Sequence, residues 1–270
     1  MKKPNLTPEA VLKGLKTHLL GRNLLCLEKT SSTNDVAMEL ARDGASEGTV
    51  VTAEAQTKGR GRQGRKWVSM EGKTLVFSVI LRPRLEIGEL SEITLAAAVA
   101  VAQTLEDYRL KPKIKWPNDL LLSGKKVCGI LTEMGPKKDK MLSVVLGIGI
   151  NLGQSARDFP PELRETATSF YRFSGRKVDR THFFQKLLLR LEENYEWVTK
   201  RGFQKVVFEW KKRSVTLGAQ VKVVQTDRFF FGQAVGLDEK GALLVRDDLG
   251  RIERVTAGDV ETLLLKKAKK

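Results

Sequence analysis

A nine-residue stretch of the sequence, GRGRQGRKW from Gly59 to Trp67, holds three arginines, one lysine and three glycines. Glycine removes side-chain bulk, so that backbone N–H groups can approach a ligand, and arginine offers a fork of donors that suits phosphate or carboxylate. These residue types predict an anion-binding loop, although a flexible basic surface loop or an RNA-binding segment of the RGG type has the same composition. Because the stretch is short, contains one tryptophan and lies between strand-like segments, its context favours a small anionic ligand.

A second motif, KWPNDLLLSGKKVCGILTE, runs from residue 115 to residue 133. Pro117 has no backbone donor and must interrupt a strand, so the chain is expected to turn at Asn118 and Asp119. If the strands on either side are neighbours, the lysines near the two turns bring ammonium groups into one cleft: Lys115, Lys125 and Lys126. Local alternatives stay open, because asparagine and aspartate are ordinary Asx-turn residues and SGKK is an ordinary hairpin turn.

Two shorter motifs add candidate binding residues. LGIGINLG, residues 146–153, predicts a buried strand whose glycines either relieve packing or let a flat ring lie against the backbone. Asn151 at its end could donate to and accept from adenine or phosphate. TSSTND, residues 30–35, begins a helix, and a plain Ser or Thr N-cap is the favoured explanation when this motif stands alone.

The bulk composition limits the class of protein. With 41% hydrophobic and 30% charged residues, the 270-residue chain is typical of a folded protein with two unequal domains. The longest largely apolar run, residues 93–102, is well short of the roughly 20 residues that span a bilayer, and MKKPNLTPEA has no apolar signal segment. A cytoplasmic protein without a membrane partner is therefore expected. Cys26 and Cys128 have no CxxC or His partner nearby, which argues against a zinc site or a disulfide framework.

The net charge of +16 is compatible with nucleic-acid binding, since clustered Lys and Arg neutralise phosphates. Much of the excess lies in dispersed pieces, such as the terminal KKAKK, which are typical of solvated ends. A basic surface would equally attract an acidic protein partner. A helix-turn-helix domain needs about three helices, and residues 1–22 have room for one, so no DNA partner is expected.

Hydrophobic period and turn residues predict a mixed α+β core followed by a small β-domain. Helices are expected at 8–20 with Thr7 as cap and Gly21 as stop, and at 34–42, 93–108, 180–199 and 202–212. Core strands are expected at 24–28, 50–55, 74–81 with an alternating pattern, 114–116, 119–122, 127–134 and 142–150. After Leu217, short strands alternate with glycine-containing and acidic turns, the pattern of a small β-barrel. We therefore expect an N-terminal helical extension over 1–22, a large α+β domain over 23–215 and a C-terminal domain over 216–270.

Together these motifs resemble the biotin protein ligase family. STN, EAQTKGRGRQGRKW, KWPNDLLLSGKKVCGILTE and GIGINLG occur in the family's order, and the resemblance covers roughly Leu24 to the C-terminus. It implies a mixed sheet flanked by helices, of the class II synthetase-like biotinyl/lipoyl transferase type, with a C-terminal SH3-like barrel. The N-terminus fits the family's short, monofunctional form without a DNA-binding domain, and a homodimer would be in keeping with the family.

The resemblance also implies a reaction and a set of site residues. Biotin and ATP would form biotinyl-5′-AMP and pyrophosphate, with Mg²⁺, and a lysine of a biotin carboxyl carrier protein would then displace AMP. The implied biotin-binding residues are Ser32, Thr33, Asn34, Gln56, Arg60, Gly61, Arg62 and Lys126. The implied ATP and adenylate residues are Arg62, Arg65, Trp67, Lys115, Asn118 and Asn151. The implied catalytic residues are Lys126, Arg62 and Asp119, with Asp119 either orienting the metal or deprotonating the acceptor lysine.

Two rival functions remain to be tested. A lipoate or octanoate ligase has a related catalytic fold, but such enzymes generally carry a different glycine-rich arginine motif. A basic nucleic-acid-binding protein would explain the charge and would leave KWPND and GIGIN without a purpose.

Overall fold

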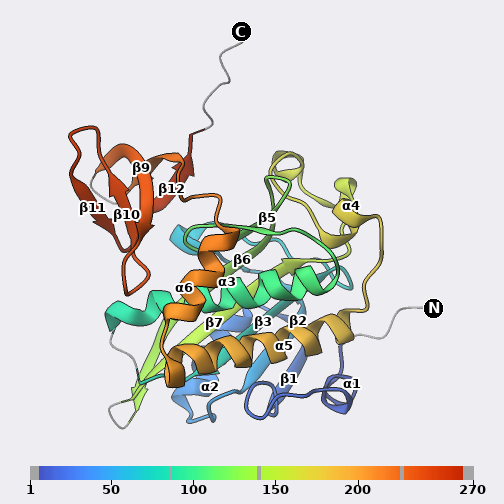
Figure 1. The fold of residues 1–270 in the computed structure, drawn as a ribbon. Helices are drawn as coiled ribbons and strands as arrows, with labels where there is room; N and C mark the ends of the chain where they lie inside the picture. The colour runs from blue at the N-terminus through green and yellow to red at the C-terminus, as the bar shows by residue number, and fades with distance from the viewer. Residues whose placement is uncertain (1–5, 85–86, 139–140, 226–227, 264–270) are drawn as a thin grey trace.

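The computed structural model of the chain describes residues 6–84, 87–138, 141–225 and 228–263, which form two β-sheets with flanking helices (Figure 1). A seven-stranded sheet has the order β1-β2-β3-β7-β6-β5-β4, and a five-stranded antiparallel sheet has the order β11-β10-β9-β8-β12. The first comprises β1 (Leu24–Thr30), β2 (Val50–Gln56), β3 (Thr74–Leu81), β4 (Lys113–Lys115), β5 (Asp119–Leu122), β6 (Lys125–Lys138) and β7 (Met141–Asn151). The second comprises β8 (Gln220–Val224), β9 (Phe229–Leu237), β10 (Leu243–Arg246), β11 (Ile252–Val255) and β12 (Asp259–Thr262).

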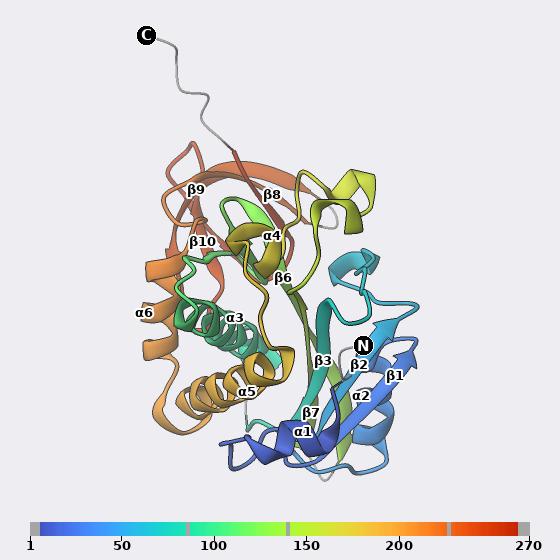
Figure 2. The same cartoon turned by 90° about the vertical axis from the view of Figure 1, so that its right-hand side faces the viewer.

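The large sheet is covered on both faces. The helices α3 (Leu90–Asp107), α5 (Arg180–Glu196) and α6 (Gln204–Arg213) lie on one side, and α2 (Thr33–Arg42) lies on the other (Figure 2). Two short helices, α1 (Pro8–Lys13) and α4 (Phe170–Ser174), complete the layers. Only β1 and β2 pair in parallel, and the other neighbours are antiparallel. The expected mixed α+β fold with a small C-terminal β-domain is confirmed.

Burial on both faces overturns one expectation about β3. Thr74–Leu81 was expected to alternate between a buried and an exposed face, but all eight residues are buried. The strand is central, with β2 and β7 as neighbours, and helices pack on both sides of it. Ser78 and Thr74 therefore supply hydrogen bonds inside the molecule rather than contacts with solvent.

The N-terminal helix is shorter than its leucine spacing indicated. Thr7 caps it as expected, by accepting from Ala10 N, but the helix ends at Lys13 with Gly14 as the C-cap, not at Gly21. The physical reason is a competing acceptor on α5: the Glu192 carboxylate takes the backbone N–H groups of residues 18, 19 and 20 at 2.6, 2.7 and 2.8 Å. In a helix these N–H groups would donate to backbone carbonyls. Because the carboxylate accepts them instead, an irregular turn leaves none of the three unpaired.

Two other elements differ from the sequence-based expectation. The helix expected at 180–199 leaves α-geometry at Glu196 and continues as a π-helical turn, Trp197–Arg201, which ends at Gly202. The helix α4 (Phe170–Ser174) was not expected, because its five residues are too few to show a hydrophobic period. None of the helices within the described ranges is long and apolar enough to cross a bilayer.

The C-terminal sheet is attached to the larger domain beside β4, the strand that leads into the KWP motif. Val215 N donates to Ile114 O at 3.0 Å, and Trp116 N donates to Thr216 Oγ1 at 2.9 Å. The buried Trp116 indole also donates to Gly241 O, at 3.3 Å, in the turn between β9 and β10. The two domains therefore meet beside the KWPND motif.

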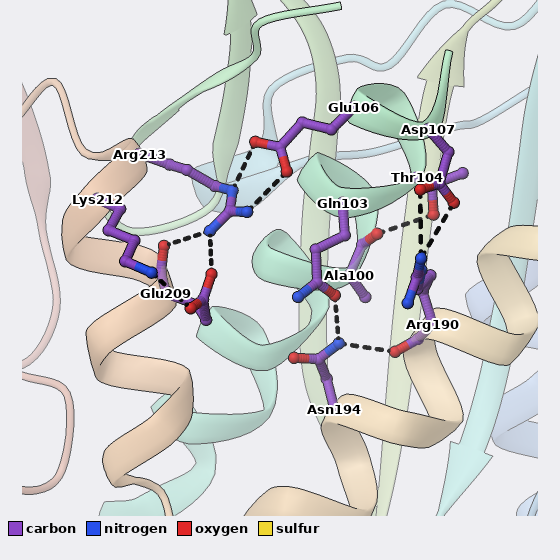
Figure 3. Close-up of polar contacts among 10 residues, drawn as sticks. All are labelled: Ala100, Gln103, Thr104, Glu106, Asp107, Arg190, Asn194, Glu209, Lys212 and Arg213. Carbon is purple, nitrogen blue, oxygen red and sulfur yellow. Dashed lines mark hydrogen bonds and ion pairs between the residues drawn. The ribbon is translucent and has the colours of Figure 1, made fainter. Parts of the chain in front are cut away.

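A cluster of ion pairs fixes the helix that leads into this junction (Figure 3). Arg213, at the end of α6, donates to both carboxylate oxygens of Glu106 on α3, at 2.8 and 2.6 Å, and to Glu209 one turn earlier, at 2.7 Å. Burial by itself lowers the pKa of Arg213, but the hydrogen bonds that it donates to the two carboxylates outweigh this effect, and the pKa is raised. On the neighbouring helix, Arg190 pairs with Asp107 in a more exposed position.

Replacing Arg213 should destabilise the protein more than replacing Arg190. The Arg213 side chain is 13% exposed, and Arg213→Met removes the cation that pairs with Glu106 and leaves Glu209 with Lys212 alone, at a cost of about 2 kcal/mol in unfolding free energy. The Arg190 side chain is 36% exposed, so Arg190→Met should cost less than about 1 kcal/mol. Denaturant titration of both variants measures the difference. Equal losses would show that the Arg213 cluster does not fix α6.

Candidate active site

One cavity of about 1050 Å³ lies between the arginine loop, the ends of the central strands and the C-terminal sheet. Every site residue nominated from the sequence lines it: Ser32, Thr33, Asn34, Gln56, Arg60, Gly61, Arg62, Arg65, Trp67, Lys115, Asn118, Asp119, Lys126 and Asn151. These residues come from four motifs that are spread over some 120 positions of the chain, so their convergence is a result of the fold. Lys125 is the exception to the expected cluster of lysines. Its Nζ pairs with the exposed carboxylate of Glu165, 3.1 Å away at the rim.

One end of the cavity is lined by neutral hydrogen-bonding groups around the start of α2. Thr33 N and Thr33 Oγ1 both donate to Gln56 Oε1, at 2.8 and 3.0 Å, which joins α2 to the end of β2. Ser32 occupies the N-cap position of α2 but makes no capping hydrogen bond with its side chain. The plain N-cap explanation for TSSTND therefore fails for Ser32, which instead lines the cavity.

Asn34 and Arg60 lie beside this neutral end and share an acidic partner on β6. Asn34 Nδ2 donates to Glu133 Oε2 at 2.5 Å, and Arg60 donates to both carboxylate oxygens of the same residue. Arg60 NH1 also pairs with Asp35, at 2.5 Å. Burial alone lowers the pKa of Arg60, but the bonds to Glu133 and Asp35 outweigh it, and the pKa is raised.

The arginine loop has its own backbone structure. Gly61 N donates to Arg65 O at 2.6 Å and Trp67 N donates to Gly59 O at 2.9 Å, so the loop folds back on itself as a narrow hairpin. A Cβ at Gly59 would lie 2.6 Å from Trp67 O, and a side chain there is excluded by this close approach. Gln63, at φ 53°, and Gly64, at φ 72°, provide the left-handed bend at the tip.

Two arginines of this loop reach the C-terminal sheet. Arg62 NH2 donates to Gly258 O at 3.0 Å, and Arg65 forms an ion pair with Asp259. Within the described part of the chain, Arg62 has no carboxylate partner at ion-pair distance, although Asp119 is close enough to raise its pKa. Burial has the larger effect and lowers the pKa of Arg62. Arg62 is therefore a largely desolvated cation that a bound anion would stabilise.

At the centre of the cavity, Lys126 lies between a carboxylate and an aromatic ring. Its Nζ is 2.6 Å from Asp119 Oδ1 and 5.9 Å from the centre of the Trp67 ring. The Trp67 indole lies flat on two paired strand glycines, since a Cβ at Gly149 would be 2.6 Å from its Nε1 and a Cβ at Gly129 would be 3.2 Å from its Cζ3. The flat ring expected against the GIGIN strand is thus the protein's own tryptophan. Its N–H is buried and has no hydrogen-bond partner among the described residues.

The remaining nominated residues form the wall next to the KWPND turn. Asn118 Nδ2 donates to Ile130 O at 2.7 Å, and Ile130 N donates to Asn118 O at 3.0 Å, so this asparagine fixes β5 against β6 while it lines the cavity. Asn151, at the end of β7, is 4% exposed and accepts from Gln154 Nε2 at 2.9 Å. Lys115 precedes the turn and adds a further cation to the wall.

Several residues around the site were not found by sequence reasoning. Glu133, Ser78, Asp259 and Gln154 contact nominated residues. Glu133 closes the KWPND motif and therefore lay within a motif already identified from the sequence. Ser78 and Asp259 carry no local signal, because their role depends on strand pairing and domain contact.

Comparisons with known proteins agree with this geometry. Residues 26–151 match the Biotin/lipoate A/B protein ligase family, and residues 216–262 match the Biotin protein ligase C terminal domain. The chain is 41% identical over 263 residues to the bifunctional ligase/repressor BirA of Bacillus spizizenii, over 97% of this chain and 81% of that protein. It is 32% identical to the biotin-acetyl-CoA-carboxylase ligase of Mycobacterium tuberculosis, over 94% and 96% of the two chains. The solved biotin protein ligase from Aquifex aeolicus in complex with biotin and ATP aligns with a TM-score of 0.77 and 34% identity, over 89% of this chain and 98% of that one.

The layered sheet and its cavity define a biotin or lipoate ligase fold. The match of the C-terminal domain and the identity along nearly the whole chain narrow this class, and the chain belongs to the biotin protein ligase family. It is an enzyme, an ATP-dependent ligase that attaches biotin to protein. The function inferred from the four motifs is confirmed, and the lipoate and nucleic-acid alternatives are not supported.

Adding a single methyl group at Gly149 should disturb the ligand site. In Gly149→Ala the new Cβ collides with the Trp67 indole, so the ring or the strand must shift, and overpacking of this kind costs about 1–3 kcal/mol. Calorimetric titration should show biotin and ATP affinities lowered by about tenfold. Gly236→Ala is a matched control in a strand of the C-terminal sheet, where the added Cβ is 3.9 Å from its nearest neighbour. Unchanged affinities in Gly149→Ala would mean that the position of Trp67 does not matter for binding.

Proposed function

We propose that this cavity joins biotin to ATP and then to a carrier lysine in two steps. In the first, a biotin carboxylate oxygen attacks the α-phosphorus of ATP, the bond to the β-phosphate oxygen breaks, and biotinyl-5′-AMP and pyrophosphate form. In the second, the neutral amine of a lysine on a biotin carboxyl carrier protein attacks the acyl carbon, AMP leaves with the bonding electrons, and the amine loses its proton. The supporting observation is the convergence of all the nominated residues on one cavity, which has neutral groups joined around the start of α2 and cations from the arginine loop and the KWPND motif.

The neutral end suits the ureido ring of biotin, which offers one carbonyl acceptor and two N–H donors. The hydroxyl and amide groups of Ser32, Thr33, Asn34 and Gln56 are both donors and acceptors, and all four residues line this end. A cyclic urea has no net charge, so a neutral site binds it without an unpaired ion. We assign these four residues to biotin recognition.

The cationic end suits two anions that repel each other. Arg62, Arg65, Lys115 and Lys126 would hold the biotin carboxylate next to the triphosphate, and Gly61 lets backbone N–H groups of the loop approach the same oxygens. Lys126 would leave its contact with Asp119 and follow the charge that develops between carboxylate and α-phosphate, where a fixed cation lowers the barrier most. Trp67, Asn118 and Asn151 would line the nucleotide side, and Arg60 lies where the two ends meet.

Magnesium fits this site as the counter-ion of the ATP phosphates. Mg²⁺ usually binds through one or two carboxylates together with substrate phosphates and water, and Asp119 supplies a carboxylate at the phosphate side. Among the described residues no cluster of three or more His, Cys, Asp or Glu side chains could hold a metal alone. Bound Mg²⁺ would neutralise phosphate charge, and Asp119 would either orient it or accept the proton of the acceptor amine.

The same proposal extends to the acceptor protein, the domain boundary, the oligomeric state and the location of the enzyme. A net charge of +16 would attract an acidic carrier domain, and the exposed cations Arg157 and Arg164 are next in sequence to residues that line the cavity. We place the domain boundary between residues 215 and 216, which the start of the C-terminal family match and the junction at Val215 support. A homodimer, a cytoplasmic location and the lack of a DNA partner remain predictions from the sequence.

Release of pyrophosphate tests the first step. The purified protein, supplied with ATP and Mg²⁺, should release pyrophosphate only when biotin is added, and lipoate should not replace biotin. Equal release with and without biotin, or preference for lipoate, would reject the proposed reaction.

Replacement of Lys126 tests the electrostatic part of the mechanism. Lys126→Ala should lower the rate of adenylate formation by about a hundredfold or more, since loss of one preorganised donor at a developing charge has this magnitude. Lys125→Ala is the matched control, because Lys125 pairs with Glu165 at the rim and should leave the rate within about twofold of wild type. Rapid-quench measurement of biotinyl-AMP compares the two. A Lys126→Ala rate equal to that of Lys125→Ala would remove Lys126 from the mechanism.

A further inference from the structure

Glu133 connects three parts of the site that are far apart in the sequence. It lies on β6, and its carboxylate contacts Asn34 at the start of α2 and Arg60 in the arginine loop. The Glu133 side chain is 27% exposed and that of Arg60 is 33% exposed, so both groups are partly shielded from water. A carboxylate at this place is unexpected in a site that must bind anions, and its contacts explain why it is there.

The carboxylate decides which end of the Asn34 amide lies where. An ionised carboxylate only accepts hydrogen bonds, so the amide NH₂ must face Glu133, and the Nδ2 to Oε2 distance is 2.5 Å. The amide oxygen must then lie on the other side, where it is 2.5 Å from the Ser78 hydroxyl and next to the backbone of Gly147. A Cβ at Gly147 would lie 2.9 Å from Asn34 Cγ, so the glycine leaves room for the Asn34 amide.

The same carboxylate engages Arg60. The guanidinium donates to both oxygens of Glu133, at 3.0 and 3.3 Å, and to Asp35 at 2.5 Å, so its fork is occupied by two acidic groups. One cation between two carboxylates gives this group a net charge of −1. Arg60 is therefore less suited than Arg62 to attract the biotin carboxylate, and better suited to fasten the loop to α2 and β6.

We propose that Glu133 is a positioning residue for biotin recognition. It acts through Asn34, whose amide oxygen it orients as an acceptor for a ureido N–H, and through Arg60, which it holds as the anchor of the loop. The inference rests on the proposed function, because it assigns the neutral end of the cavity to the ureido ring. With the amide reversed, NH₂ would face a ligand N–H, and the ligand would lose a hydrogen bond and leave a buried donor unpaired.

The variant Glu133→Gln keeps the shape of the side chain but replaces the carboxylate, which only accepts hydrogen bonds, with an amide that both donates and accepts. The orientation of the Asn34 amide is then no longer fixed. The amide introduced at position 133 has two orientations. In one, its oxygen accepts from Asn34 and its NH₂ faces the guanidinium of Arg60, so that two donors meet. In the other, its NH₂ faces Asn34 and favours the reversed orientation of the Asn34 amide. The dissociation constant for biotin should rise about tenfold or more, as when a buried polar group loses its partner. The dissociation constant for ATP should change less than about threefold, because the nucleotide side is formed by other residues. Glu28→Gln, an exposed change on β1 of the same sheet, should alter neither constant.

A swap of acid and amide gives the stricter test. In Asn34→Asp alone, two carboxylates face each other, and biotin binding should weaken by about tenfold or more. In the double variant Asn34→Asp with Glu133→Gln, the amide NH₂ introduced on β6 can donate to the carboxylate introduced on α2. Ser78 keeps an oxygen to donate to, and the net charge beside Arg60 is unchanged. Biotin affinity should recover to within about fivefold of wild type, although both positions are altered.

Calorimetry of biotin and of ATP, with thermal unfolding recorded for every variant, separates the outcomes. A merely structural role would lower the melting temperature and both affinities together, and the swap would not restore biotin alone. Wild-type biotin affinity in Glu133→Gln, or a double variant no better than the worse single variant, would overturn the inference while the proposed function stands. Failure of the wild-type protein to bind biotin at all would reject the proposed function, and the inference with it.

Discussion

Repulsion between like charges is the constraint on which this site depends, both before and after ligands bind. Six cationic side chains line one cavity and would repel one another without counter-charges: Arg60, Arg62, Arg65, Lys66, Lys115 and Lys126. Three of them are paired with carboxylates that come from other parts of the chain: Asp35 and Glu133 for Arg60, Asp259 for Arg65, and Asp119 for Lys126. Each acidic partner is near enough to offset this repulsion, and Arg65 and Lys126 can exchange theirs for ligand oxygens.

The fold places these charges by two geometric devices. Glycines at paired positions of β6 and β7 remove side chains from the sheet surface, so that Trp67 and Lys126 can lie against Gly129 and Gly149. The C-terminal sheet, fastened at Trp116, supplies Gly258 O and Asp259 to the arginine loop. The loop conformation is thus determined jointly by the central sheet and by a domain that starts about 150 residues later in the chain.

The sequence predicted most of this site because its motifs lie at the ends of strands. Neighbouring strand ends lie close together at one edge of the sheet, so the side chains of these motifs meet there. The strands and helices of the core were found within a few residues, and every nominated residue except Lys125 lies at the cavity. The partners of those residues could not be predicted, because Glu133, Ser78 and Asp259 depend on register and domain contact, which carry no local pattern. The same limit explains the errors at α1 and β3. The expected helix ends early because a carboxylate on α5 accepts the backbone N–H groups of residues 18–20, and β3 does not alternate because both of its faces are buried.

The central claim is that fixed cations let a carboxylate and a triphosphate occupy one cavity together. Calorimetric titration of a non-hydrolysable ATP analogue, in the presence of Mg²⁺, with and without saturating biotin, tests it most directly. The account predicts that both ligands bind at once and that biotin leaves the nucleotide affinity undiminished. Mutually exclusive binding, in which saturating biotin displaces the nucleotide analogue, would contradict it.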